Sequence, residues 1–198
     1  MKTLIISDRD AHHFDGLDIG DAVQVSLRDA GGDTELVTID GDAMHPCLGC
    51  FDCFVKTPGM CRQTHDAANA VARSEIQSDA VVLVSRITYG GYSYDTKSFL
   101  DRSIQIIGAF FEIVDDTMRH SRRYDRFPAL ISLGYGAYTD KEAATFADLT
   151  RHNALNMRPP RQAVFMAKDG DGVGRAVRSL TDMLTGLLAN TQTQGVQS

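Results

Sequence analysis

The chain has 198 residues, of which 43% are hydrophobic and 23% are charged, a composition that suits one globular domain and excludes disorder over most of its length. Its net charge of −6 argues against nucleic acid or an anionic membrane surface as the main partner. No apolar run approaches the roughly 20 residues that span a bilayer, and the start MKTLIISDRD has too short an apolar run for a signal peptide, so we expect a cytoplasmic protein.

Five short apolar segments alternate with amphipathic segments along the chain. The apolar ones, which we expect to be β-strands, are residues 3–7, 35–39, 80–85, 129–133 and 163–167. Apolar residues at helical spacing predict helices over residues 19–27, 68–76, 100–111, 143–157 and 173–188. This alternation is typical of the α/β class and predicts a five-stranded parallel sheet with helices on both faces. The second strand alternates polar and apolar residues, which indicates an edge position.

Two segments stand out from this alternation. Residues 45–63 form a loop that holds all four cysteines, and residues 112–127 form a long connection rich in arginine. We expect a single domain over residues 1–190 that includes both, followed by a flexible polar tail over residues 191–198. The arginine-rich insertion either reaches a partner subunit, or clamps a phosphate of a nicotinamide cofactor, or is a solvated loop whose arginines pair with nearby aspartates.

The cysteines are Cys47, Cys50, Cys53 and Cys61, and none occurs elsewhere in the chain. A secreted disulfide framework would spread its cysteines, so this tight spacing indicates metal, cluster or redox chemistry. The first three have the spacing that wraps a [4Fe–4S] cluster, and the last supplies a fourth ligand. Two alternatives stay open. The thiols are free and form at most a reversible disulfide, or they bind zinc, whose structural sites usually pair two separated knuckles.

Parallel sheets bind ligands beyond the carboxyl ends of their strands. The loops at that end cover residues 7–16, 86–93 and 134–138, and the cysteine loop follows the second strand, so we expect it to emerge there too. Paired glycines let a backbone approach a planar ligand, and tyrosines stack on one. The candidate contacts are Tyr89, Gly90, Gly91, Tyr92, Ser93, Gly134 and Tyr135. The alternative is that these segments only form turns between strand and helix.

Two motifs carry a family resemblance. One is the cysteine run of residues 47–61, and the other is the apolar strand and loop of residues 84–93, followed by Lys97 and by the segment 99–102. Together they resemble the flavodoxin-like NAD(P)H-dependent FMN reductase family, in particular its iron–sulfur flavoprotein branch. The resemblance implies a flavodoxin-like three-layer sandwich that binds FMN, with NAD(P)H as co-substrate. It also implies a small-molecule or protein electron acceptor and a homo-oligomer.

The first loop departs from the phosphate-binding loop of that family. It keeps Ser7 and Arg9, which the resemblance implies as contacts to the FMN phosphate, but it adds Asp8, Asp10 and Asp15. Carboxylates repel a phosphate unless they point away from it. We predict an FMN-dependent NAD(P)H oxidoreductase or electron-transfer flavoprotein, with or without an iron–sulfur cluster, and no catalytic side chain, because the cofactor supplies the redox step. The alternative is a flavodoxin-like binding module that has lost its flavin.

Overall fold

The main sheet of the protein contains five parallel strands, as the sequence predicts. The structure is a computed structural model that describes residues 1–194. The strands are β1 (Lys2–Asp8), β2 (Asp33–Ile39), β3 (Ala80–Arg86), β6 (Ala129–Tyr135) and β7 (Gln162–Ala167). They pair in the order β2-β1-β3-β6-β7, so β2 lies at an edge, as its alternating sequence indicates.

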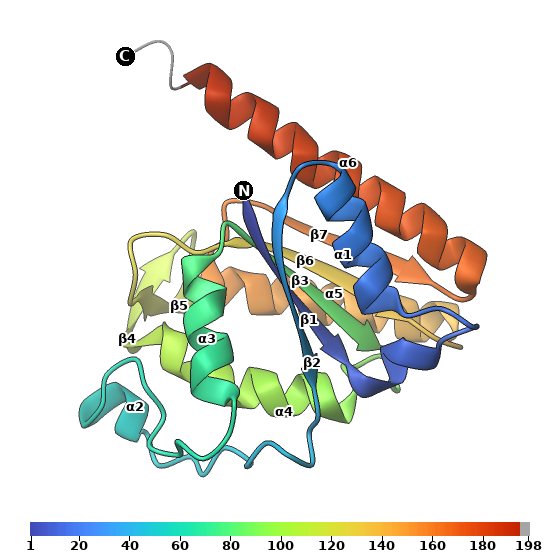
Figure 1. Cartoon of the computed structure of the whole chain (residues 1–198). Coiled ribbons are helices and arrows are strands. Elements are labelled where there is room, and N and C mark those ends of the chain that lie inside the picture. Colours follow the sequence, from blue (N-terminus) through green and yellow to red (C-terminus); the bar gives the residue numbers. More distant parts are fainter. Residues whose placement is uncertain (195–198) are drawn as a thin grey trace.

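Helices cover both faces of this sheet (Figure 1). One face carries α1 (Ile19–Asp29) and α6 (Gly170–Gln194), and the other carries α3 (Ala68–Gln77), α4 (Tyr94–Arg102) and α5 (Asp140–Met157). The predicted three-layer sandwich is confirmed. Three short helices lie in the connections: α2 (Asp52–Val55) in the cysteine loop, and the 3-10 helices η1 (Arg9–His13) and η2 (Ser103–Ile106).

The hydrophobic core forms two layers, one on each side of the sheet. In β1, Ile5 packs with residues of α1 and α6, whereas Leu4 and Ile6 pack with residues of the opposite face. All three side chains are buried. Side chains alternate between the two faces along a strand, so a strand covered on both faces needs a continuous apolar run. This explains why the sequence alone identifies β1 and β3 as central strands.

One predicted helix is wrong beyond its first turns. The segment predicted as a helix over residues 100–111 ends its helical part at Ile106, and the chain then forms an antiparallel hairpin of β4 (Ile107–Val114) and β5 (Thr117–Arg122). β-branched residues favour a strand here. The hairpin closes through Asp115 and Asp116, whose φ values of 50° and 56° suit a tight two-residue turn. The arginine-rich insertion is therefore this hairpin together with the loop that follows it.

The last helix is longer than the sequence predicts. α6 extends to Gln194, so residues 191–194 of the predicted flexible tail continue the helix, and the remaining residues 195–198 lie outside the described part of the chain. In residues 1–194, no helix combines the length and the apolar composition that crossing a bilayer requires.

Candidate functional site

A surface depression of about 520 Å³ lies beyond the carboxyl ends of β1 and β3. We call it the strand-end crevice, and its lining includes Arg9, Arg86, Tyr89, Ser93, Tyr94 and Asp95. In a sheet with the order 2-1-3-4-5, β1 and β3 flank the point where the strand order reverses, and FMN binds at this point in flavodoxin itself. The crevice is therefore where a ligand of this fold is expected.

The side chain of Asp8 fills the space behind the crevice. It is 1% exposed and accepts hydrogen bonds from the backbone N–H groups of Ala11 at 3.2 Å and Arg86 at 2.7 Å. The hydroxyl of Tyr135 donates a third hydrogen bond to the same carboxylate. Burial raises the pKa of Asp8, although hydrogen bonds from Ser93 and Tyr135 oppose the rise. The hydrogen-bond donors of η1, β3 and β6 that meet near the end of β1 are therefore occupied by a carboxylate of the protein itself.

Arg9, a predicted phosphate contact, is committed to carboxylates. Its Nη2 lies 3.0 Å from Asp95, and its Nη1 lies 3.0 Å from both Asp40 and Asp42. Burial alone would raise the pKa of Asp95, but hydrogen bonds from Arg9 and from the N–H of Gly41 outweigh it and lower that pKa. Ser7, the other predicted contact, is buried, and its hydroxyl donates to the carbonyl oxygen of Asp8 at 3.4 Å.

The predicted ring-binding loop after β3 exposes one aromatic side chain to the crevice. Tyr89 is 92% exposed and has a φ of 53°, at the tip of a turn closed by hydrogen bonds between Thr88 and Gly91. Gly90 has a φ of 78°, and a Cβ there would lie 2.8 Å from Thr145 of α5. Ser93 is buried and caps α4 by accepting from the N–H of Thr96. Tyr89 is thus the residue of this loop that is free to meet a planar ligand.

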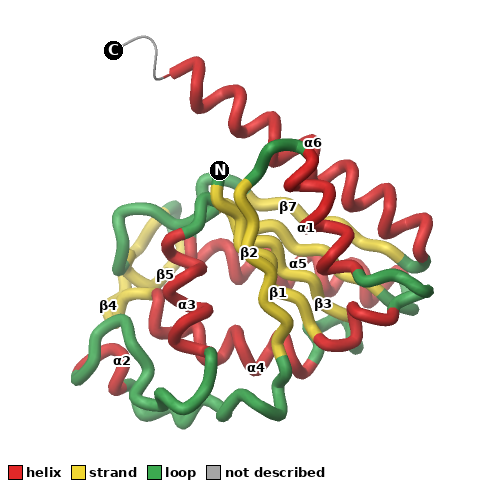
Figure 2. Tube along the Cα trace, in the orientation of Figure 1, coloured by secondary structure: helices red, strands yellow, loops and turns green. Residues whose placement is uncertain are grey.

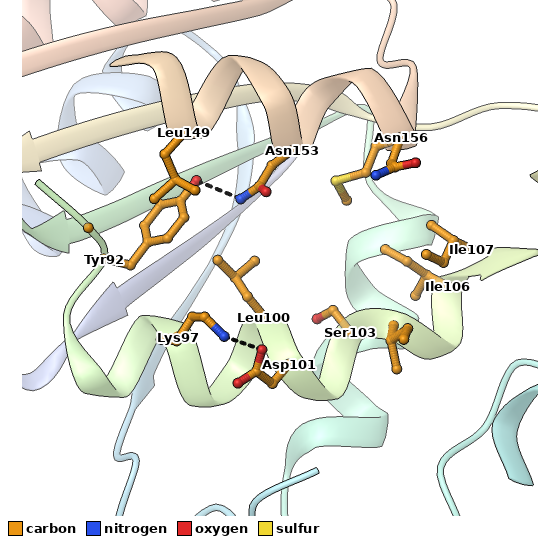
Figure 3. A pocket seen from close by; sticks show the side chains of 13 residues that line it. Tyr92, Lys97, Leu100, Asp101, Ser103, Ile106, Ile107, Leu149, Asn153 and Asn156 are labelled. Carbon is orange, nitrogen blue, oxygen red and sulfur yellow. Dashed lines mark hydrogen bonds and ion pairs between the residues drawn. The ribbon is translucent and has the colours of Figure 1, made fainter. Parts of the chain in front are cut away.

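The other predicted contacts point into the protein. Tyr92 packs edge-on against Phe146 at 5.4 Å between ring centroids, and its hydroxyl accepts from Asn153 at 3.2 Å (Figure 3). Gly134 lies in β6, where a Cβ would come within 2.7 Å of Phe146. Tyr135 is buried against Asp8. These residues pack behind the crevice. A Gly-Tyr pattern in the sequence does not show whether its residues pack inside the protein or contact a ligand.

A second cavity, of about 470 Å³, lies between α4 and α5 (Figure 3). Leu100 and Leu149 face each other across it, and Met157 is also among its lining residues. An ion pair between Lys97 and Asp101 lies at its rim. The sequence does not reveal this cavity, because its lining residues have the apolar helical spacing that is typical of the buried faces of two helices.

The four cysteines line one small cavity of about 100 Å³. Cys47 and Cys50 are exposed, Cys61 is half-buried and Cys53 is buried, and all four are free thiols. Burial raises the pKa of Cys53, and the three neighbouring thiols raise it further. In residues 1–194, no three Cys, His, Asp or Glu side chains already have the arrangement of a metal site. The structure therefore brings the predicted ligands together around one space without fixing a coordination geometry.

The buried side chain of Arg102 binds both ends of the cysteine loop. Its guanidinium donates to the carbonyl oxygens of His45 at 2.7 Å and Gln63 at 3.1 Å, and to both carboxylate oxygens of Asp66. The side chain also lines the cysteine cavity, and its buried Nε has no hydrogen-bond partner. One donor therefore remains unused beside the thiols.

The crevice and the cysteine cavity lie at opposite ends of α4. Ser93, Tyr94 and Asp95 at the start of this helix border the crevice, and Arg102 at its end borders the cavity. A helix of nine residues is about 14 Å long. The cysteine loop leaves β2 at the crevice end, as we expected, but then runs past α4 to its other end (Figures 1 and 2).

The arginines of the insertion all have partners in the chain. Arg123 donates to the carbonyl oxygen of Cys53 at 3.3 Å, and so ties the insertion to the cysteine loop. Arg122 donates to the carbonyl oxygen of Arg158, whereas Arg119 and Arg126 pair with Asp115 and Asp79. The solvated-loop alternative expects these arginines to pair with Asp115, Asp116 and Asp125, and of the four only Arg119 pairs with one of these aspartates.

Comparison with solved structures decides the fold. An azoreductase from Bacillus anthracis matches with a TM-score of 0.62 at 11% identity, over 94% of this chain and 98% of that one. An FMN-dependent NADH-azoreductase from the same species, solved in complex with FMN, matches with a TM-score of 0.60 at 12% identity, over 96% and 100% of the two chains. The chain has the flavodoxin-like fold. A flavodoxin, a WrbA-like protein from Agrobacterium tumefaciens, gives a TM-score of 0.54 at 10% identity, over 96% and 98%.

Comparison with curated proteins finds relatives of this flavodoxin-like chain among iron–sulfur flavoproteins. One from Methanocaldococcus jannaschii is 28% identical over 78 residues, and one from Archaeoglobus fulgidus is 33% identical over 84 residues. These matches cover 39% and 42% of this chain, but only 39% and 37% of the relatives' own length. No protein-family model matches the chain. The solved structures confirm the fold that the resemblance implies, and the curated matches show that part of the chain is similar to iron–sulfur flavoproteins.

Proposed function

We propose that the protein is a flavin-dependent oxidoreductase or electron-transfer flavoprotein with a [4Fe–4S] cluster in its cysteine loop. The observation that carries the proposal is the cavity lined by Cys47, Cys50, Cys53 and Cys61 beside the unpartnered Nε of Arg102. The two relatives named above as iron–sulfur flavoproteins support it. NAD(P)H as electron donor, and a small molecule or protein as acceptor, belong to the same proposal.

The residues of the cavity fit a cluster. Four thiolates are the ligand set that a [4Fe–4S] cluster takes, and the cluster supplies one-electron transfer when bound. The guanidinium of Arg102 would balance part of the negative charge of the thiolates, and its free Nε–H would donate to a sulfur atom. Leu48 and Ile104 add apolar side chains to the wall of the cavity. Zinc would use the same thiolates but would leave the protein without colour.

The strand-end crevice fits part of FMN. The exposed ring of Tyr89 and the backbone of the turn at residues 88–91 fit a planar flavin, which would supply hydride and electron transfer. The phosphate does not fit, since Asp8 uses the donors at the end of β1 and the guanidinium of Arg9 is paired with carboxylates. The protein's own contribution is to orient the ring and to shield it on one side.

The decisive experiment is an anaerobic preparation of the whole chain with its iron counted. We expect a brown protein with about four irons per chain. Cys50→Ala should lose the iron, whereas Thr64→Ala, at an exposed position directly after the cysteine loop, should keep it. A colourless wild-type protein without iron would contradict the cluster, and a colourless protein with one zinc per chain would replace it by a zinc site.

One observation favours a second function. Asp8 and the guanidinium of Arg9 both interact with other groups of the protein and are not free to bind a phosphate. This observation favours the alternative function of a flavodoxin-like binding module without a flavin. Calorimetric titration with FMN and with riboflavin separates the two. Binding of either flavin excludes the module, whereas a protein that binds neither and holds no iron would be the module. The clustering of the cysteines in one short segment also suits the cytoplasm that the sequence predicts.

A further inference from the structure

Aspartates between residues 8 and 18 cap three of the helices that begin at the carboxyl end of the sheet. Asp8 accepts from the N–H of Ala11 in η1, Asp18 accepts from Asp21 in α1 at 2.9 Å, and Asp15 accepts from Gly170 at the start of α6 at 2.8 Å. A phosphate bound by a βα loop is held by N–H groups of this kind at a helix N-terminus. In this protein, carboxylates of the first loop already occupy them.

The carboxylate of Asp8 is the most deeply placed of the three. It lies at the end of β1 and receives hydrogen bonds from η1, from the end of β3 and from the hydroxyl of Tyr135 in β6. Three donors from three elements converge on it, although they are far apart in the sequence. A phosphate seeking the same donors would meet a buried negative charge that cannot move aside without breaking all three bonds.

The cations of the crevice offer no alternative anchor. Arg9 faces Asp95, Asp40 and Asp42 at 3.0 Å, and Arg86 pairs with Asp10 at 3.1 Å. Three carboxylates therefore surround the guanidinium of Arg9, and a fourth carboxylate neutralises the guanidinium of Arg86. What the crevice still offers a ligand is aromatic and backbone surface, chiefly the exposed rings of Tyr89 and Tyr94.

We propose that the strand-end crevice binds a flavin whose side chain ends in an uncharged hydroxyl, and that Asp8 excludes the phosphorylated form. This rests on the proposed function only in that a flavin ring occupies the crevice. Asp8 then acts as a specificity-determining residue, because a site built around one anion rejects a ligand that brings a second anion to the same donors. Riboflavin and FMN differ only in the phosphate and are the matched probes.

The test is a titration of the whole chain with riboflavin and with FMN, in which binding is measured by the quenching of the flavin fluorescence. For the wild-type protein we expect riboflavin to bind about tenfold more tightly than FMN or better, a difference of about 1.4 kcal/mol. Asp8→Ser removes the charge and supplies a hydroxyl, so it should bring FMN to the affinity of riboflavin or beyond. Asp140→Asn at the start of α5 removes one exposed negative charge that contacts neither the three donors nor Arg9 or Arg86, so it should leave the wild-type preference in place.

Each outcome decides the proposal. Wild-type protein that binds FMN as tightly as riboflavin overturns the role of Asp8 and leaves the proposed function standing. An Asp140→Asn variant whose affinity for FMN rises as much as that of Asp8→Ser overturns it too, since general charge would then explain the preference. If Asp8→Ser does not fold by circular dichroism, the wild-type ratio alone decides. Protein that binds neither flavin overturns the proposal, and the iron count of the same sample shows whether the cluster part of the function survives.

Discussion

Arg102 and Asp66 form an ion pair in the interior of the protein, with Nη1 and Oδ2 2.7 Å apart and both side chains almost completely buried. Asp66 precedes α3, and Arg102 is the last residue of α4, so the pair joins the far end of the cysteine loop to the helix that the loop runs past. Arg102 belongs to the motif segment 99–102, yet nothing in the sequence shows that it meets Asp66.

Removing Arg102 should destabilise the protein strongly. Arg102→Met keeps the length of the side chain but leaves the buried carboxylate of Asp66 and two carbonyl oxygens without their donor. Breaking a buried ion pair in this way costs about 3–5 kcal/mol of unfolding free energy. Urea denaturation measures it. Arg151→Met, which breaks the exposed pair with Asp148, is the control and should cost less than about 1 kcal/mol. Equal losses in the two variants would mean that Arg102 is not a special anchor.

Glu75 should make stability depend on pH. It is buried in α3, and burial raises the pKa of its carboxyl to about 8, while a hydrogen bond from Ser103 opposes the rise. The folded state then holds a proton that the unfolded state releases above its ordinary pKa of 4.5. The contribution to stability is therefore complete below pH 4.5, falls as the pH rises and is lost above about pH 8.

Glu75→Gln tests this dependence, because glutamine has no proton to lose. Relative to the wild type, the variant should gain on the order of 4 kcal/mol of unfolding free energy between pH 4.5 and pH 8. Denaturant titrations of both proteins across this range measure the difference. Two stability curves that run parallel would show that Glu75 is ionised inside the folded protein.

Two glycines should respond in opposite ways to alanine. At Gly134 in β6, a Cβ would lie 2.7 Å from Phe146 and 2.8 Å from Ile87, so Gly134→Ala overpacks the core and should cost about 1–3 kcal/mol. At Gly186 in α6, a Cβ meets nothing within 4 Å, so Gly186→Ala should stabilise the helix by about 0.5–1 kcal/mol. Thermal unfolding of both variants gives the two signs. If Gly134→Ala stabilised the protein instead, the space beside β6 would be large enough for a Cβ atom, contrary to the structure.

The metal-free thiols should differ in reactivity. Cys47 and Cys50 are exposed, whereas Cys53 is buried and its pKa is raised by burial and by the neighbouring thiols. Because the thiolate is the reacting form, Cys53 should be alkylated about tenfold more slowly than Cys47 at pH 8. Mass spectrometry of iodoacetamide-treated apoprotein measures each rate. Adding denaturant should make the rates equal, and equal rates without denaturant would show that the loop is open.

The hairpin should mediate self-association. Phe110, Phe111 and Ile113 of β4 and Met118 of β5 are large apolar side chains, and each is more than half exposed. Exposed apolar groups gathered on one element are typical of an interface, and the family resemblance implies a homo-oligomer. We expect sedimentation to show a wild-type dimer or larger and a monomer for the double variant Phe110→Ser, Ile113→Ser. A wild-type monomer at every concentration would remove this role.

The sheet could be predicted from the sequence because its signals are local. Continuous apolar runs identify central strands and helical spacing identifies the helices that cover them, so β1, β3, α1 and α5 agree closely with the structure. The hairpin could not, since Leu100, Ile104, Ile107 and Phe111 have helical spacing although the chain turns into a strand at Ile107. The strand that begins there pairs with β5, and β5 contacts α5, an element that comes much later in the sequence.

The crevice was harder to predict than the sheet. Tyr89 and Tyr135 lie in similar Gly-Tyr contexts, yet Tyr89 is exposed and Tyr135 is buried against Asp8. The difference depends on the direction in which each backbone leaves its strand, which composition does not encode. The sequence did show that the first loop is unusually acidic, but whether Asp8 points away from a phosphate or into its place is decided only by donors from β3 and β6.

The β4–β5 hairpin also constrains the order in which the chain assembles as it is synthesised. An isolated two-stranded hairpin is marginal in water, and this one is anchored by Arg158, which donates to the carbonyl oxygen of His120 and pairs with Glu112. Domains fold from their N-terminus as the ribosome releases them, so β4 and β5 emerge before their anchor exists. Until α5 follows, the hairpin lacks this anchor, and a pause in translation before Arg158 would prolong the time in which its two strands are only marginally stable.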